Sequence, residues 1–164
     1  MKVTCKHCEG TGKLGLQRET CCFCGGKGYT GKDDKKVFLG GTCNESTWRD
    51  KLIPMLKIDY FNPVVDDWTE ECYLEELRQR EICDYCLYVI TPLMTGVYSI
   101  AEVIDDSNKR PDKTLFCVLE EDASLQFDKG QMKSLERTGL MVQKNGGKYF
   151  KSLEEVSEYL NKGE

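Results

Sequence analysis

Cysteine spacing is the clearest chemical signal in this sequence. The pattern Cys-x-x-Cys-x-Gly-x-Gly occurs twice, at residues 5–12 and again at residues 21–28. Each Cys-x-x-Cys forms a tight turn that aims two sulfurs at one point, and the glycines let the backbone turn where a Cβ would clash. Two such turns predict one tetrahedral metal site.

This segment resembles half of a DnaJ-type cysteine-rich zinc finger. That family usually has four repeats that form two zinc sites, whereas this chain has two repeats. The resemblance implies one structural Zn²⁺ bound by Cys5, Cys8, Cys21 and Cys24. His7 and Cys22 are alternative ligands, but Cys21 keeps both the two-residue spacing and the glycine positions. Because the segment has few apolar side chains, metal binding should supply most of its folding free energy.

The charge distribution argues against a nucleic-acid partner. The 164-residue chain has a net charge of -5, and residues 1–30 carry five basic and two acidic side chains, a balance of +3. Four thiolates on one dication lower this local balance to about +1. Because duplex binding relies on an excess of positive charge, we expect no nucleic-acid partner.

Neither export nor membrane insertion is predicted. The first ten residues, MKVTCKHCEG, contain no apolar core after a basic start, and no run approaches the roughly 18 apolar residues of a membrane span. We therefore expect a cytoplasmic protein with no membrane partner. In that reducing compartment, ten cysteines are metal ligands or buried side chains rather than disulfides.

Beyond the cysteines, β-rich runs alternate with amphipathic helical stretches. A polar linker separates a predicted knuckle at residues 1–31 from an α/β domain at residues 36–164. The predicted strands are residues 37–41, 58–61, 86–91, 115–119 and 140–142. The predicted helices are residues 47–57, 69–84, 99–107, 129–137 and 153–160, with Leu74, Leu77 and Ile82 at helical spacing in the second. This alternation predicts a flavodoxin-like three-layer α/β sandwich with a five-stranded parallel sheet.

Ligands of such sheets bind beyond the carboxyl ends of the strands, which selects the loops at residues 40–46, 62–69 and 91–98. Short motifs stand in and beside these loops: Val37-Phe38-Leu39-Gly40-Gly41, Trp48-Arg49, Phe61-Asn62-Pro63, Asp66-Asp67-Trp68, Asp84 and Ser99-Ile100-Ala101-Glu102. In this order they resemble the nucleoside 2-deoxyribosyltransferase-like family over about residues 36–161.

The resemblance implies cleavage or exchange of the N-glycosidic bond of a nucleoside or nucleotide. Glu102 would attack the anomeric carbon, and Asp84 would help to position the nucleoside. A carboxylate suits this chemistry because departure of the base leaves oxocarbenium-like charge on the sugar. Other roles are open: Ser99-x-x-Glu102 also fits a helix capping box, and Asp84 also fits a turn.

Further substrate contacts are expected in the same loops. The indole of Trp68, beside Asn62 and Asp67, suits stacking and edge hydrogen bonds to a nucleobase, although it could also pack beneath a loop. Thr95 and Gly96 precede Glu102 in the third loop.

The first loop and the helix that follows it offer backbone atoms and a cation for substrate binding. Gly40 and Gly41 would let the backbone approach a sugar or phosphate, or would simply permit a turn. Arg49, near the start of the first predicted helix, would meet a phosphate or pair with an acidic neighbour.

One departure from the family leaves the activity open. Its well-characterised enzymes carry an aspartate about six residues before the nucleophile, where this chain reads Met94-Thr95-Gly96-Val97. The alternative function is a nucleotide-binding module without turnover, whose zinc knuckle docks a protein partner. Because enzymes of the family assemble as homo-oligomers, the resemblance also implies association of copies of this chain.

The remaining cysteines are predicted to be mostly structural. Cys83 and Cys86 form Cys-x-x-Cys without nearby glycines or a second pair, so we expect buried side chains rather than a redox pair. Cys43, Cys72 and Cys117 look like isolated small apolar residues. Cys43 stands in a predicted site loop, so solvent exposure is the alternative for this residue.

Overall fold

The computed structural model describes residues 2–5, 8–14, 19–21, 24–31, 35–43, 45–67 and 69–162. Packing divides the chain into two compact units. The first joins Met1–Phe38 to Ile58–Asp84, and the second joins Leu39–Lys57 to Tyr85–Glu164. The boundary expected from the sequence, with a knuckle at residues 1–31 and an α/β domain at residues 36–164, stays a prediction.

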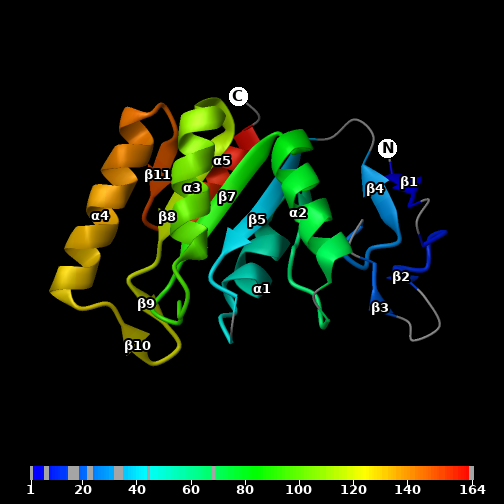
Figure 1. The fold of residues 1–164 in the computed structure, drawn as a ribbon, viewed down its shortest axis with the longest axis horizontal. Helices are drawn as coiled ribbons and strands as arrows, with labels where there is room; N and C mark the ends of the chain where they lie inside the picture. The colour runs from blue at the N-terminus through cyan, green and yellow to red at the C-terminus, as the bar shows by residue number, and fades with distance from the viewer. Residues whose placement is uncertain are drawn as a thin grey trace. The chain divides into compact units, whose positions relative to one another are not determined.

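A five-stranded parallel sheet confirms the predicted α/β class (Figure 1). Its strands are β5 (Lys36–Gly41), β6 (Asp59–Phe61), β7 (Tyr85–Ile90), β8 (Thr114–Val118) and β11 (Lys148–Phe150). Their order in the sheet is β11-β8-β7-β5-β6. When the five strands are numbered in chain order and read from the β6 edge, this is the 2-1-3-4-5 order of flavodoxin-like folds. All six residues of β7 are buried, as expected for an apolar strand covered on both faces.

Helices connect these strands. They are α1 (Trp48–Leu52) with a 3₁₀ turn at Ile53–Met55, α2 (Glu70–Ile82), α3 (Tyr98–Lys109) with a 3₁₀ turn at Pro111–Lys113, α4 (Lys129–Lys144) and α5 (Leu153–Lys162). In the second unit α3 contacts α4 and α1 contacts α5, and the two pairs cover opposite faces of the sheet (Figure 1). A short hairpin of β9 (Glu121–Asp122) and β10 (Leu125–Gln126) precedes α4.

Side-chain caps mark two of the helix starts. The Thr69 side chain accepts a hydrogen bond from the Cys72 backbone N–H at 3.3 Å and begins α2. Asp128 and Gln131 form a capping box at α4, in which each side chain accepts from the other residue's backbone N–H. These caps satisfy backbone donors that the first turn of a helix leaves without partners.

The predicted strand at residues 140–142 is wrong, because these residues continue α4 and the fifth strand is β11. Gly139 does not end the helix. A Cβ at this position would lie 2.6 Å from the Tyr149 ring, so the glycine makes room for an aromatic side chain. The buried residues of α4 are Leu135, Gly139 and Val142.

The apolar face predicted for α2 is also wrong. Leu74 and Ile82 are 57% and 54% exposed, whereas Glu75 and Gln79 are buried. The Gln79 amide donates to the Glu75 carboxylate at 2.6 Å, and Arg78 donates to both carboxylate oxygens at 2.7 Å. Polar side chains can be buried here because they satisfy one another.

Two short antiparallel ladders frame the cysteines of the first unit. One pairs β1 (Lys2–Thr4) with β4 (Tyr29–Gly31), and the other pairs β2 (Lys13–Leu14) with β3 (Glu19–Thr20). Thr4 lies opposite Tyr29, and Thr20 lies opposite Lys13. The two repeats are offset by 16 residues. With this offset Thr4 corresponds to Thr20 and Lys13 corresponds to Tyr29, so exchanging the repeats turns one pair into the other. The ladders therefore have pseudo-twofold symmetry.

Within the part of the chain that the structure describes, no helix has both the length and the apolar content needed to cross a bilayer.

Candidate functional site

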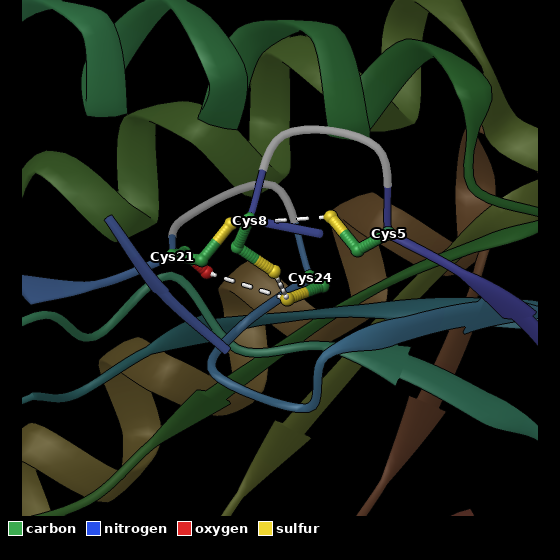
Figure 2. A group of neighbouring side chains, drawn as sticks. All are labelled: Cys5, Cys8, Cys21 and Cys24. Atoms are coloured by element: carbon green, nitrogen blue, oxygen red, sulfur yellow. Dashed lines mark hydrogen bonds between the residues drawn. The ribbon is translucent and has the colours of Figure 1, made fainter. Parts of the chain in front are cut away.

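The four predicted metal ligands come together in the first unit. Their sulfur atoms lie within 4.8 Å of one another, and Figure 2 shows them turned toward a common point. Two sulfur separations are 4.0 Å, between Cys5 and Cys21, and 3.7 Å, between Cys8 and Cys24. Four sulfurs bound tetrahedrally to zinc at about 2.3 Å stand about 3.8 Å apart. The cluster therefore fits a tetrahedral ion and is compatible with a zinc knuckle.

Backbone donors support the cysteine sulfurs symmetrically. Gly12 N–H donates to Cys8 Sγ at 3.3 Å, and Gly28 N–H donates to Cys24 Sγ at 3.2 Å. Both glycines have positive φ, and a Cβ on either would lie about 2 Å from a carbonyl oxygen of the other repeat, at 2.0 Å and 2.2 Å respectively. These positions require glycine, which explains the Gly-x-Gly after each cysteine pair.

The surroundings of Cys8 favour a thiolate, the form that binds metals. Burial raises the pKa of this thiol, but the hydrogen bonds from Gly12 N–H and from the Cys5 and Cys24 side chains outweigh it and lower the pKa to about 7. The alternative ligands His7 and Cys22 lie outside the described residues.

In the second unit, the end of β5 is fixed by two buried side chains of α1. The Arg49 guanidinium donates to the carbonyl of Leu39 at 2.9 Å and to that of Thr42 at 2.7 Å, and stacks on Trp48. The Trp48 indole N–H also donates to the Thr42 carbonyl, at 2.8 Å. Arg49 is only 5% exposed. This geometry gives Arg49 a structural role, and its contact with a phosphate stays a prediction.

Gly40 and Gly41 are the last, buried residues of β5. Gly41 has a φ of 113°, and a Cβ there would lie 2.1 Å from the carbonyl oxygen of Val89. The next residue, Thr42, donates its backbone N–H to that carbonyl at 2.8 Å. Gly41 is thus needed for the close approach of two strands, and substrate contact by either glycine stays a prediction.

The loop after β7 is held at its first residue. Thr91 N–H donates to the hydroxyl of Thr42 at 3.0 Å, and the hydroxyl of Thr91 accepts from Leu93 N–H at 3.3 Å. The predicted substrate residues Thr95 and Gly96 follow and are exposed. A Cβ at Gly96 would have no atom within 4 Å, so the loop has open space beside it.

Glu102 lies early in α3 and is half-buried. The capping-box alternative for Glu102 is wrong, because the N-cap residue of α3 is Val97 and makes no side-chain cap hydrogen bond. Ser99 instead lies within the helix. The helix starts one residue earlier than predicted, and Glu102 is not part of its cap.

Asp84 immediately precedes β7, whereas α3 is reached from the carboxyl end of that strand. The Asp84 carboxylate accepts from Lys36 N–H at 2.7 Å, and Asp84 N–H donates to the Lys36 carbonyl at 2.9 Å. These contacts support the turn alternative, since they tie the residue before β7 to the start of β5. A role of Asp84 in catalysis stays a prediction.

The loop after β6 begins with an asparagine turn. The side-chain oxygen of Asn62 accepts from Val64 N–H at 3.1 Å. Asn62 is half-buried and Asp67 is exposed, whereas Trp68 lies outside the described residues. The predicted contacts of Asn62, Asp67 and Trp68 with a nucleobase are therefore not tested by this geometry.

A sequence model of the family described as "nucleoside 2-deoxyribosyltransferase like" matches residues 34–121, just over half of the chain. The chain belongs to this family. No curated protein matches the chain.

The nucleoside 2-deoxyribosyltransferase-like match covers β5 to β8 and contains Glu102, Asp84 and all the predicted substrate residues. It begins after the cysteine cluster, so the knuckle lies outside the matched part. Two residues that the sequence analysis did not single out as site residues, Thr42 and Thr91, join the loops after β5 and β7. Threonine directly after a buried strand was the only signal for either.

Proposed function

We propose that this protein cleaves or exchanges the N-glycosidic bond of a nucleoside or nucleotide, with Glu102 as the nucleophile. The observation that carries the proposal is the position of this carboxylate. Glu102 is half-buried in the first turns of the helix that follows β7, within the region matched by the family. Sites of parallel α/β sheets lie beyond the carboxyl ends of the strands, which is where this helix begins.

The reaction proceeds in two steps. An oxygen of the Glu102 carboxylate bonds to the anomeric carbon while the carbon–nitrogen bond to the base breaks, and the base leaves with the bonding electrons and takes up a proton. The resulting glycosyl ester is then attacked by water, which gives the sugar, or by a nitrogen of a second base, which gives a new nucleoside. Both outcomes regenerate the carboxylate.

Two features of the loop between β7 and α3 support substrate binding in this proposal. The bond between Thr91 N–H and Thr42 fixes the start of the loop before α3, and open space adjoins Gly96. Asn62, Asp67 and Trp68 are proposed to contact the base, and the backbone at Gly40, Gly41 and Thr95 to contact the sugar or phosphate. Arg49 and Asp84 enter as residues that hold the backbone.

We also propose that Cys5, Cys8, Cys21 and Cys24 bind one structural Zn²⁺. The sulfur separations of 4.0 Å and 3.7 Å and the two N–H donors to sulfur support this choice of ion. Four sulfurs would fill a tetrahedral ion, which leaves no position for a substrate. A cytosolic location suits such a site because its thiols stay reduced there. Metal analysis of purified protein should find one zinc per chain.

The test of the proposed reaction is chromatographic detection of free base after incubation with nucleosides, deoxynucleotides and dinucleotide cofactors. Glu102→Gln should lower the rate of base release by about a thousandfold or more, because it removes the nucleophile at nearly constant volume. Asp105→Asn is the matched control, since Asp105 is an exposed acid on the same helix, paired with Lys109.

A second function has one observation in its favour, the absence of an acidic side chain at residues 94–97. If no panel member yields free base while one of them raises the melting temperature of both wild type and Glu102→Gln, the protein is a nucleotide-binding module. A protein partner for the knuckle and association of copies of the chain stay predictions.

A further inference from the structure

Lys27 extends from the second cysteine repeat to β6. Its ammonium lies 2.5 Å from Asp59 Oδ1 and 2.5 Å from the carbonyl oxygen of Tyr60, and 4.2 Å from the centre of the Tyr60 ring. The Lys27 and Asp59 side chains are only 11% and 13% exposed. Packing places both residues in the same compact unit. This ion pair is therefore an internal contact of that unit rather than a surface pair.

Lys27 also belongs to the turn that surrounds a metal ligand. Its backbone N–H donates to the Cys24 carbonyl at 3.2 Å, and the next residue, Gly28, donates to Cys24 Sγ at 3.2 Å. In the same turn, a Cβ on Gly25 would lie 3.8 Å from the backbone N and O of Asn62. One short turn thus contacts the metal ligand, β6 and the residue that follows β6.

The pseudo-twofold symmetry of the knuckle supplies an internal comparison. With the 16-residue offset, the equivalent of Lys27 is Thr11, whose hydroxyl lies 2.6 Å from the Cys8 carbonyl oxygen and 2.9 Å from that of Lys13. Thr11 therefore closes its own turn, whereas Lys27 binds residues outside the knuckle. The equivalent of Gly25 is Glu9, which is exposed. The repeats differ at both positions where the second one contacts the β6 segment.

We propose that Lys27 is a positioning residue that couples metal binding at the knuckle to β6 and to the turn at Asn62. The metal fixes the turn from Cys24 to Gly28, this turn holds the Lys27 ammonium, and Lys27 holds Asp59 and Tyr60. Loss of the metal releases the turn, because metal binding supplies most of the folding free energy of a segment as small as the knuckle. The consequence for substrate rests on the proposed function, in which Asn62 contacts the base, but the coupling itself does not.

The experiment compares wild type with Lys27→Thr in the full chain. Threonine copies the residue at the equivalent position, so the turn can close as it does at Thr11. Lys13→Thr is the matched control, because Lys13 is an exposed lysine of the same knuckle whose ammonium contacts Thr20. Zinc content and amide hydrogen exchange at residues 59–64 are measured with and without a chelator.

In wild type and Lys13→Thr, chelation should raise amide exchange at residues 59–64 by about tenfold or more. The reason is that Asp59 and Tyr60 lose their fixed contacts with the Lys27 ammonium. Lys27→Thr should show that faster exchange while it still holds zinc, and chelation should add little. The proposal is overturned if zinc-loaded Lys27→Thr exchanges as slowly as wild type, or if chelation of wild type affects only the knuckle.

A second variant covers the case in which Lys27→Thr fails to hold zinc. Asp59→Ala removes the partner from β6 and leaves the knuckle sequence intact, so it should keep its zinc and still exchange rapidly at residues 60–64. Slow exchange in zinc-loaded Asp59→Ala also overturns the proposal. None of these readouts uses a substrate, so absence of base release would count against the proposed function and leave the coupling result intact.

Discussion

The hydroxyl of Thr42 accepts a hydrogen bond from the backbone N–H of Thr91 at 3.0 Å, and both residues are buried. Thr42 directly follows β5, and Thr91 directly follows β7. The bond therefore joins two of the loops in which the sequence predicts substrate contacts. It also fixes the start of the segment that leads to Glu102.

Replacing this threonine tests the importance of the bond. Thr42→Val removes the acceptor and leaves the Thr91 N–H buried without a partner, so the free energy of unfolding should fall by about 1–3 kcal/mol. Base release should slow as the loop loses its anchor. Urea unfolding measures the first effect, and Thr138→Val is the control, because the hydroxyl of this half-buried α4 threonine donates only to the Ser134 carbonyl of its own helix, at 3.2 Å. Unfolding of Thr42→Val at the wild-type urea concentration would contradict this role.

Gly28→Ala tests the geometry of the proposed zinc site. Alanine is strained at a φ of 76°, its Cβ would lie 2.2 Å from the Gly10 carbonyl oxygen, and the N–H that donates to Cys24 Sγ would move. Zinc affinity should fall by about 10- to 100-fold, as for other residues that orient metal ligands. Competition with a chromogenic chelator measures the affinity. Gly96→Ala, where a Cβ meets no atom within 4 Å, should keep the wild-type value.

Gly139→Ala should destabilise the protein despite its position inside α4. Alanine ordinarily stabilises a helix interior by roughly 0.5–1 kcal/mol relative to glycine. Here its Cβ would lie 2.6 Å from the Tyr149 ring, so we expect a loss of about 1–3 kcal/mol from overpacking. Chemical denaturation measures the change, and Tyr149→Val should restore stability to the Gly139→Ala background. A Gly139→Ala variant that is more stable than wild type would show that the ring moves at no cost.

Cys43 and Cys117 should differ sharply in thiol reactivity. Cys43 is exposed, whereas burial, with smaller contributions from Glu155 and Glu154, raises the pKa of the Cys117 thiol to about 12. Because the thiolate is the reactive form, a disulfide reagent at pH 8 should modify Cys43 in the folded protein and leave Cys117 intact. Peptide mapping identifies the modified residues, and Cys43→Ser should lose the fast phase. Rapid modification of Cys117 would contradict its described burial.

The sequence predicts the cysteine cluster and the sheet because both leave local patterns. The cysteines of the cluster stand three residues apart within each repeat, and the Gly-x-Gly that follows each pair supplies the positive φ that these turns require. The sheet was predicted from short apolar runs separated by helical stretches. Burial of Cys83 and Cys86, expected because neither glycines nor a second cysteine pair stand near them, is also confirmed.

Predictions failed where a distant residue decides the outcome. The run at residues 140–142 was predicted as a strand because local periodicity does not distinguish three apolar residues of a strand from the side of a helix. The Tyr149 ring, which leaves no room for a Cβ, explains why position 139 inside α4 is a glycine. The same limit applies to Arg49, whose bonds to backbone carbonyls have no sequence signature, and to Lys27, whose partner Asp59 lies 32 residues away.

The most direct test of the central claim is intact-protein mass spectrometry after acid quench of a single turnover. It uses a substrate from which the wild-type chain releases base. A glycosyl ester should raise the mass of wild type by one sugar residue, located on the peptide that contains Glu102, and should be absent from Glu102→Gln. Base release by Glu102→Gln at the wild-type rate, without any such adduct, would contradict the assignment of Glu102 as the nucleophile.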